Sequence, residues 1–172
     1  TSTFVPHIYS DEELRRLLAG VEANQTGKGG TIAAVTFRAC LLLLYGTGLR
    51  LGEALALRHE DVNLRAGMIL IRDTKFYKSR HLPIGPHFTQ VLAAYVAAVP
   101  ADGGPTPTAF FVNRRGHRLP HQTVRYNFAS LRQRVGVHGR MHDLRHTFAV
   151  HRLLAWYREG ADVQRCLPHL ST

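Results

Sequence analysis

The sequence predicts a mainly α-helical domain with one small antiparallel β-sheet, an α+β fold. Apolar residues recur at helical spacing through most of the chain, and two short apolar runs flank a polar turn as in a β-hairpin. A length of 172 residues suits one domain with its own hydrophobic core. Hydrophobic residues make up 45% of the chain, which indicates a globular and not a disordered protein.

The first third of the chain predicts three helices. A capping box at Ser10 to Glu13 begins a helix that continues to about Glu22. Its expected buried residues are Leu14, Leu17 and Leu18. A strongly apolar helix over 31–45 is expected to be central, because nearly all of its surface is hydrophobic. The Gly-Thr-Gly run at 46–48 breaks this helix, and a short helix resumes over 49–57.

A hairpin and a second helical region follow. Strands are expected at 68–71 and 80–84, with a polar turn between them. Pro86 can occupy the first turn of a helix that runs to about Val99. The remaining expectations are a proline-rich loop over 100–107, a short strand at 110–112, helices over 120–135 and 143–157, a stop at Gly160, and a last short helix from 161 to 167.

The chain is strongly basic. It carries 22 Lys and Arg against 12 Asp and Glu, a formal net charge of +10, and its pI is about 10.4. This balance is typical of a protein that binds a polyanion such as nucleic acid. Charge alone is also compatible with a basic surface that serves only solubility.

The cysteines and the absence of long apolar runs bear on location. Cys40 and Cys166 lie among apolar neighbours, so both are expected to be buried thiols in a reducing compartment. No apolar run reaches the roughly 18 residues of a membrane span, and no signal peptide opens the chain. The expected location is the cytoplasm of a bacterium, without membrane contact.

Three separated segments carry candidate chemistry. The first is 46–55, with Arg50 and Glu53; the second is 74–84, with Lys75, Lys78 and Arg80; the third is 142–149, with His142 and Arg145. Each segment alone has an ordinary structural explanation: an i,i+3 ion pair for Arg50, a solubilised hairpin tip, a helix cap for His142 and a solvated charge for Arg145.

Together the three segments predict a phosphate site. Two arginines and a histidine stand at helix starts, where free N–H groups and partial positive charge favour a phosphate. The guanidinium fork of arginine binds phosphate oxygens in pairs, and a lysine on the hairpin can reach the same phosphate. No carboxylate cluster suited to Mg²⁺ accompanies them, so no metal is expected.

The three segments resemble the sequence boxes of the tyrosine recombinase, or phage integrase, family. Gly-Leu-Arg-x-Gly-Glu resembles the first arginine box, Lys-x-x-Lys-x-Arg-x-x-Pro the catalytic lysine hairpin, and His-x-x-Arg-His-x-Phe-Ala the second arginine box. Lys75 follows Arg50 by 25 residues (75 − 50) and Arg145 follows it by 95 (145 − 50). The start at 6–14 also resembles that of the family's catalytic domain. The resemblance implies a DNA breaking-rejoining fold over residues 1–172.

The resemblance also implies roles. Arg50 and Arg145 would clamp the scissile phosphate and stabilise its transition-state charge. Lys75 would be the general acid for the leaving 5′-oxygen, and His142 would assist proton transfer at the nucleophile. Glu53 would orient Arg50 without contacting the phosphate itself.

Substrate and partners follow from the same resemblance. Lys78 and Arg80 would contact DNA, and the substrate would be double-stranded DNA, cut and rejoined site-specifically by a tetramer of identical subunits. A 3′-phosphotyrosine intermediate conserves bond energy, so neither ATP, cofactor nor metal is expected.

The nucleophile is expected outside the chain. Tyr157 lies only 12 residues after Arg145 (157 − 145), too close for the family's spacing, and Trp156 beside it predicts packing. The run at 167–172 resembles the stretch just before the family's Leu-Gly-His box, so His169 is interpreted as structural. The family's N-terminal DNA-clamping domain is also expected to be missing, and the 172 residues alone are expected to be inactive in cleavage.

Three other functions remain open on sequence grounds. A nucleophile-less remnant could bind DNA without cutting it. His142 and His146 have the i,i+4 spacing of a zinc metalloprotease, but Asp143 replaces the required Glu and Arg145 would repel a cation. An RNA-binding role lacks a visible aromatic stacking platform. The sequence does not specify the DNA site, or whether the role is integration, excision, resolution or transposition.

Overall fold

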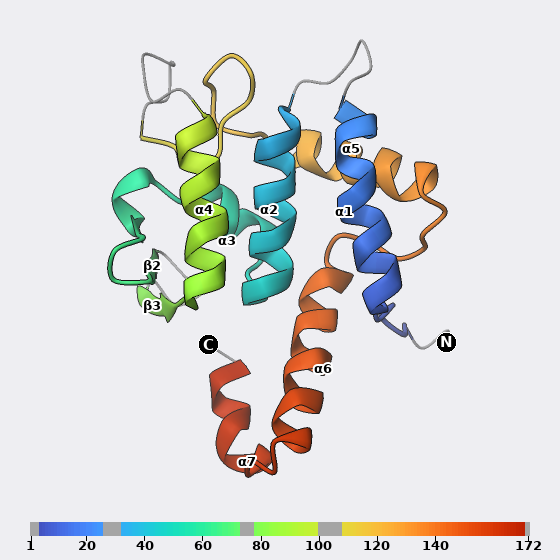
Figure 1. Ribbon diagram of the computed structural model, residues 1–172, viewed down its shortest axis with the longest axis vertical. Helices are drawn as coiled ribbons and strands as arrows, with labels where there is room; N and C mark the ends of the chain where they lie inside the picture. Colours follow the sequence, from blue (N-terminus) through green and yellow to red (C-terminus); the bar gives the residue numbers. More distant parts are fainter. Residues whose placement is uncertain (1–3, 26–31, 73–77, 100–107, 171–172) are drawn as a thin grey trace.

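The computed structural model describes residues 4–25, 32–72, 78–99 and 108–170, apart from the side chains of Pro168 and His169 (Figure 1). Its helices are α1 (Asp11–Gln25), α2 (Ala34–Thr47), α3 (Leu51–Ala56), α4 (Pro86–Ala98), α5 (His121–Arg134), α6 (Asp143–Arg158) and α7 (Val163–Cys166), with 3₁₀ turns η1 (His59–Asp61) and η2 (Leu167–Leu170). Its strands are β1 (Val62–Asn63), β2 (Met68–Ile71) and β3 (Arg80–Pro83). The predicted mainly α fold with a small antiparallel sheet is confirmed.

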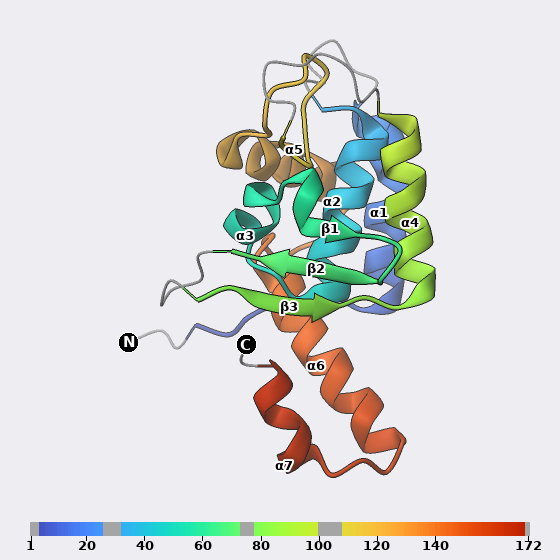
Figure 2. The ribbon, with the colours of Figure 1, turned by 90° about the vertical axis from the view of Figure 1, so that its left-hand side faces the viewer.

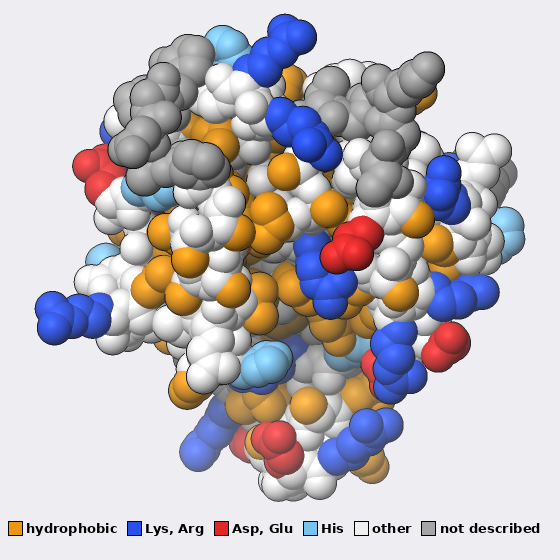
Figure 3. Space-filling model, turned by 45° about the horizontal axis from the view of Figure 1, so that its top comes forward, with side chains coloured by type: hydrophobic (Ala, Val, Ile, Leu, Met, Phe, Trp, Pro, Cys, Tyr) orange, Lys and Arg blue, Asp and Glu red, His pale blue; other side chains and the backbone are white. Residues whose placement is uncertain are grey.

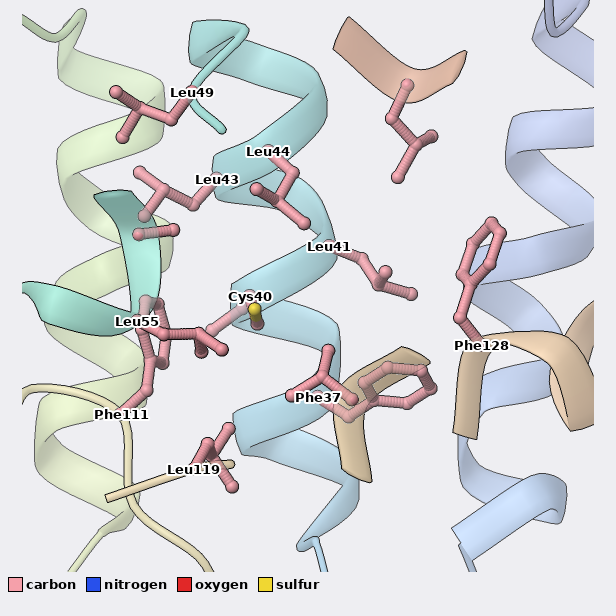
Figure 4. Close-up of a cluster of buried hydrophobic side chains, with 14 of the residues drawn as sticks. Phe37, Cys40, Leu41, Leu43, Leu44, Leu49, Leu55, Phe111, Leu119 and Phe128 are labelled. Carbon is pink, nitrogen blue, oxygen red and sulfur yellow. The ribbon is translucent and has the colours of Figure 1, made fainter. Parts of the chain in front are cut away.

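Helix α2 is the centre of the fold. It contacts α1 on one side, α4 on the other, and the start of α6, while α1 also packs on α5 (Figure 1). Phe37, Cys40 and Leu44 of α2 are buried together with Phe111 and Phe128 from later segments (Figure 4). Burying each large apolar side chain contributes about 1.5–3 kcal/mol. The apolar helix is therefore central, as predicted, because α1, α3, α4 and α6 all pack against it.

The start of α1 confirms the predicted capping box. The Ser10 backbone N–H donates to Glu13 Oε2 at 2.8 Å, and the Glu13 N–H donates to Ser10 Oγ at 3.1 Å. Leu14 and Leu17 are buried, whereas Leu18 is only partly buried. The helix extends beyond the expected end at Glu22, because Val21 and Gln25 also face the core.

Gly48 ends α2 at the predicted break. Its φ of 67° lies in the left-handed region, and its N–H donates to the Leu44 carbonyl at 3.0 Å. A Cβ at this position would stand 2.4 Å from Cδ1 of Phe148 in α6. Glycine is therefore required here twice, by the backbone angle and by the close approach of α6. The chain turns at once into α3, whose N-cap residue is Arg50.

The sheet is antiparallel with the order β1-β2-β3 (Figure 2). Ile69 of β2 pairs with Leu82 of β3 and with Val62 of β1. The two predicted hairpin strands are confirmed, and β1 is an additional strand that was not expected. Residues 73–77 of the turn, which include Lys75, lie outside the described residues.

Two local expectations were wrong. Residues 110–112 form no strand, because Val112 pairs only through an isolated bridge to Arg118. Cys166 is partly exposed, whereas Cys40 is fully buried; both thiols are free. In the described part of the chain, no helix combines the length and the apolar character needed to cross a membrane.

Helix α6 has an anchored and a protruding half. Its buried residues are Asp143, Leu144 and Thr147, all within its first turns. Beyond them the helix leaves the body and contacts α7 (Figures 1 and 2). Tyr157 is 77% exposed on this half, so the predicted packing of Tyr157 was wrong.

Candidate active site

An open cleft of about 1310 Å³ is bordered by α3, the start of α5 and the start of α6. Seven arginines line it: Arg50, Arg58, Arg72, Arg118, Arg125, Arg140 and Arg145. His121 and His142 join them, and Glu53 is the one carboxylate in the described lining. Such a cleft concentrates positive potential and attracts an anion. On the face shown in Figure 3, Lys and Arg side chains are scattered among hydrophobic side chains, carboxylates and histidines.

Arg50 is the first component of the site. Its backbone N–H donates to Glu53 Oε2 at 2.9 Å, and its Nη1 lies 3.4 Å from Glu53 Oε1. This pairing between the N-cap and the third helical residue begins α3. The Arg50 side chain remains 52% exposed and is part of the cleft lining. Glu53 thus contacts both the backbone and the side chain of Arg50, and its expected role of orienting Arg50 stays a prediction.

Arg80 is a second partner of Glu53. Its Nη1 lies 3.2 Å from Oε1 and its Nη2 lies 3.4 Å from Oε2, a two-point ion pair between β3 and α3. Burial raises the pKa of Glu53, but the Arg50 N–H and the Arg80 fork outweigh it and lower the pKa overall. Glu53 is therefore a carboxylate at neutral pH.

Arg145 reaches the cleft from the first turn of α6. Its Nη1 donates to the Gly48 carbonyl at 2.6 Å, across 97 positions of sequence. Burial, then the charge of Arg50, lowers the pKa of Arg145. Both guanidinium groups line the same cleft, and arginine stays protonated in proteins. An anion between them would relieve their repulsion.

His142 stands just before α6 and lines the same cleft. Burial, then His146 and Arg145, lowers the pKa of His142 below 6.5, so its ring is neutral at pH 7 and can accept a proton. It occupies the N-cap position of α6, but its side chain makes no capping hydrogen bond. The Asp143 carboxylate instead accepts the Arg140 N–H at 2.8 Å.

The His142 and His146 rings meet edge to face at 5.0 Å. A zinc protease site would need a third ligand beside them. Within the described ranges, no three His, Cys, Asp or Glu side chains gather in a way that could hold a metal.

The structure thus brings Arg50, Glu53, Arg145 and His142 to one cleft, and Arg80 to Glu53. Lys78 is exposed just before β3, and Lys75 lies outside the described residues. Sequence reasoning missed the other cleft arginines, which are Arg58, Arg72, Arg118, Arg125 and Arg140. The available signal was the excess of arginine; which of them share a face depends on the folded chain.

The described tyrosines all lie away from the cleft lining. Tyr9 and Tyr95 are buried, Tyr45 pairs with His151 Nδ1 at 3.0 Å, and Tyr126 and Tyr157 are exposed elsewhere. None of these five side chains borders the space between Arg50 and Arg145.

Known proteins resemble the chain over nearly its whole length. A putative integrase/recombinase, y4rE, of Sinorhizobium fredii (strain NBRC 101917 / NGR234) is 36% identical and aligns with 97% of this chain and 55% of its own length. Tyrosine recombinase XerC of Chlamydia caviae is 36% identical over 77% of this chain and 43% of its own length. The chain therefore spans about half the length of the curated relatives it matches.

Solved structures share the fold. The crystal structure of XerA recombinase matches 99% of this chain and 55% of its own, with a TM-score of 0.73 at 23% identity. A lambda integrase (75-356) dimer bound to a COC' core site matches 99% of this chain and 58% of its own, with a TM-score of 0.71 at 16% identity. The family model described as the phage integrase family covers residues 9–171. The chain belongs to the phage integrase family of tyrosine recombinases.

Proposed function

We propose that this chain supplies the phosphate-binding side of an active site for site-specific DNA recombination, by strand cleavage and rejoining through a 3′-phosphotyrosine. The observation that carries the proposal is the pair Arg50 and Arg145. They come from segments far apart in sequence, at the starts of α3 and α6, and they line one cleft. Guanidinium groups so placed match the oxygens of a phosphodiester.

In the proposed reaction, a tyrosine oxygen attacks phosphorus while the bond from phosphorus to the 5′-oxygen breaks. Arg50 and Arg145 stabilise the additional negative charge on the non-bridging oxygens. Neutral His142 accepts the tyrosine proton, and Lys75 donates a proton to the 5′-oxygen. Rejoining reverses these steps, and the ester conserves the bond energy.

We infer that the attacking tyrosine comes from a segment other than those described. None of the five described tyrosines lines the cleft. We further propose duplex DNA as the partner, because lambda integrase, a structural relative, has been solved bound to DNA and the chain carries a charge of +10. A tetramer on DNA in the cytoplasm completes the proposal.

Binding of duplex DNA tests the cleft. Each phosphate contacted lowers the slope of log affinity against log salt by about 0.9. Four contacts then predict roughly a 100-fold loss of affinity between about 50 and 200 mM salt. Arg50→Gln and Arg145→Gln should each weaken binding by roughly tenfold in fluorescence anisotropy.

Arg15→Gln is the matched control, because Arg15 is an exposed arginine on α1 outside the cleft lining. It should leave affinity within about twofold. If Arg15→Gln weakens binding as much as Arg145→Gln, or if salt has no effect, the cleft is not the DNA site.

A DNA-binding remnant without cleavage is the second candidate, favoured by the absence of a described tyrosine from the cleft. An intact pocket can activate a phosphate for slow attack by water. Nicks above background that disappear in Arg145→Gln favour the recombinase site, whereas binding without any nicking favours the remnant.

A further inference from the structure

Arg80 is held by an ion pair that turns it away from a direct role on DNA. Both of its terminal nitrogens contact the two oxygens of Glu53, and only 20% of its side chain is exposed, against 52% for Arg50. It is also absent from the cleft lining, whereas Arg50 and Glu53 belong to it. A guanidinium in this state has little surface left for a phosphate.

Resting on the proposed function, we propose that Arg80 is a positioning residue: it acts through Glu53 to keep the Arg50 fork open for phosphate, and does not touch DNA itself. Glu53 accepts from the Arg50 backbone N–H, from Arg50 Nη1 and from both Arg80 nitrogens. The carboxylate is therefore shared between two guanidinium groups, and the paired contact goes to Arg80.

Because Glu53 is shared, its contacts with Arg80 determine how much of the Arg50 guanidinium remains available for phosphate. The Arg50 side chain makes one contact to Glu53, at 3.4 Å, whereas Arg80 contacts both carboxylate oxygens, at 3.2 and 3.4 Å. Without Arg80, the nearly buried carboxylate keeps its charge and has one guanidinium left to pair with. Arg50 would then close on Glu53 in the bidentate geometry that such pairs prefer. The phosphate would lose one of its two proposed clamps.

The same ion pair fixes the hairpin relative to α3. Arg80 is the first residue of β3 and Glu53 lies in α3, 27 positions earlier. Arg80 follows Lys75 by five positions in the sequence (80 − 75). The ion pair thus anchors the start of β3 to α3.

The salt dependence of duplex binding in an Arg50→Gln background separates positioning from contact. In the wild-type background, Arg80→Gln should weaken binding roughly tenfold and reduce the slope against log salt by about 0.9, because the Arg50 contact to phosphate is lost. In the Arg50→Gln background, where that contact is already missing, Arg80→Gln should leave the slope unchanged. Arg125→Gln is the matched control: Arg125 is an exposed arginine of the cleft lining, and its loss should reduce the slope by about 0.9 in both backgrounds. A slope that falls as much with Arg80→Gln as with Arg125→Gln in the Arg50→Gln background would overturn the proposal.

A double-mutant cycle with Glu53 gives a second test. If Arg80 acts through Glu53, Arg80→Gln should change affinity less than about twofold in a Glu53→Gln background. An equal loss in both backgrounds would mean a direct contact. Arg80→Lys keeps the charge but not the fork, so it should restore only part of the affinity. Affinities are compared per folded molecule, with unfolding midpoints measured alongside.

The NMR signal of the Arg50 side chain provides a readout that needs no DNA. Arg80→Gln should shift the Arg50 Nε–H resonance as the fork closes on Glu53, and an unmoved resonance would refute the positioning role. Wild-type protein that fails to bind DNA would instead refute the proposed function. The two failures are therefore distinguishable.

Discussion

Replacing Gly48 by alanine should destabilise the fold and the site together. The φ of 67° places an alanine in the left-handed region, at a cost of about 1–2 kcal/mol. The added Cβ would lie 2.4 Å from Phe148 Cδ1, and relieving such overpacking costs about 1–3 kcal/mol. The sum is about 2–5 kcal/mol, a large part of the roughly 5–15 kcal/mol that stabilises a domain.

Urea denaturation measures this loss, and thermal unfolding should show a midpoint lower by at least about 4 °C. Because the Gly48 carbonyl accepts from Arg145, DNA affinity should fall as well. Gly52→Ala is the control, since a Cβ there meets nothing within 4 Å and Gly52 lies in α3. It should leave stability unchanged or raise it by up to about 1 kcal/mol.

A second variant separates the two costs. In a Phe148→Ala background the clash is gone, so Gly48→Ala should cost only the backbone term of about 1–2 kcal/mol. If Gly48→Ala stays within about 0.5 kcal/mol of the parent protein in both backgrounds, the reasoning about this turn is refuted.

Three further outcomes are expected. The 172 residues should form no covalent adduct with a suicide DNA substrate on a denaturing gel, because no described tyrosine lines the cleft; an adduct mapped to Tyr157 would refute this. The pKa of Glu53 is lowered in the folded state, so the unfolded chain binds more protons below pH 4.5, and the free energy of unfolding should decrease as the pH falls there. The decrease should be shallower in Glu53→Gln. Equal pH dependence of the two proteins in urea titrations would contradict this expectation. Thr147→Val should lower the free energy of unfolding by about 1–3 kcal/mol, since the buried hydroxyl accepts the Tyr9 N–H and donates to the Asp143 carbonyl. Thr89→Val, which removes an exposed hydroxyl, should lower it less. Equal losses of stability in chemical denaturation would refute the argument.

Local signals were sufficient for most of the helices. The capping box at Ser10, the glycine at 48 and the proline at 86 each act within one turn of chain, so their effects could be predicted from neighbours alone. Strand β1 was missed because two residues are too few to show an alternating pattern. Residues 62–63 form a strand because β2 pairs with them, and their own sequence carries no signal of that pairing.

The contacts of the candidate site are likewise of two kinds: local ones that the sequence predicts, and long-range ones that it does not. Arg50 and Glu53 could be predicted to interact because they are three residues apart. The contacts of Arg145 with Gly48 and of Arg80 with Glu53 span 97 and 27 positions, and no local pattern encodes them. The burial of Cys166 in α7 and of Tyr157 in α6 was wrongly predicted for a related reason: apolar neighbours in sequence bury a side chain only when another element covers that part of the helix.

The division of α6 into two halves has a mechanical consequence. Its first turns carry Arg145 and are clamped by buried Leu144 and Thr147, while its far end contacts α7 beyond the body (Figure 2). The far end of α6 can therefore fray or bend while the buried first turns hold the Arg145 guanidinium in place. Amide hydrogen exchange should record this as a step along one continuous helix, with slow exchange near Thr147 and fast exchange near Tyr157.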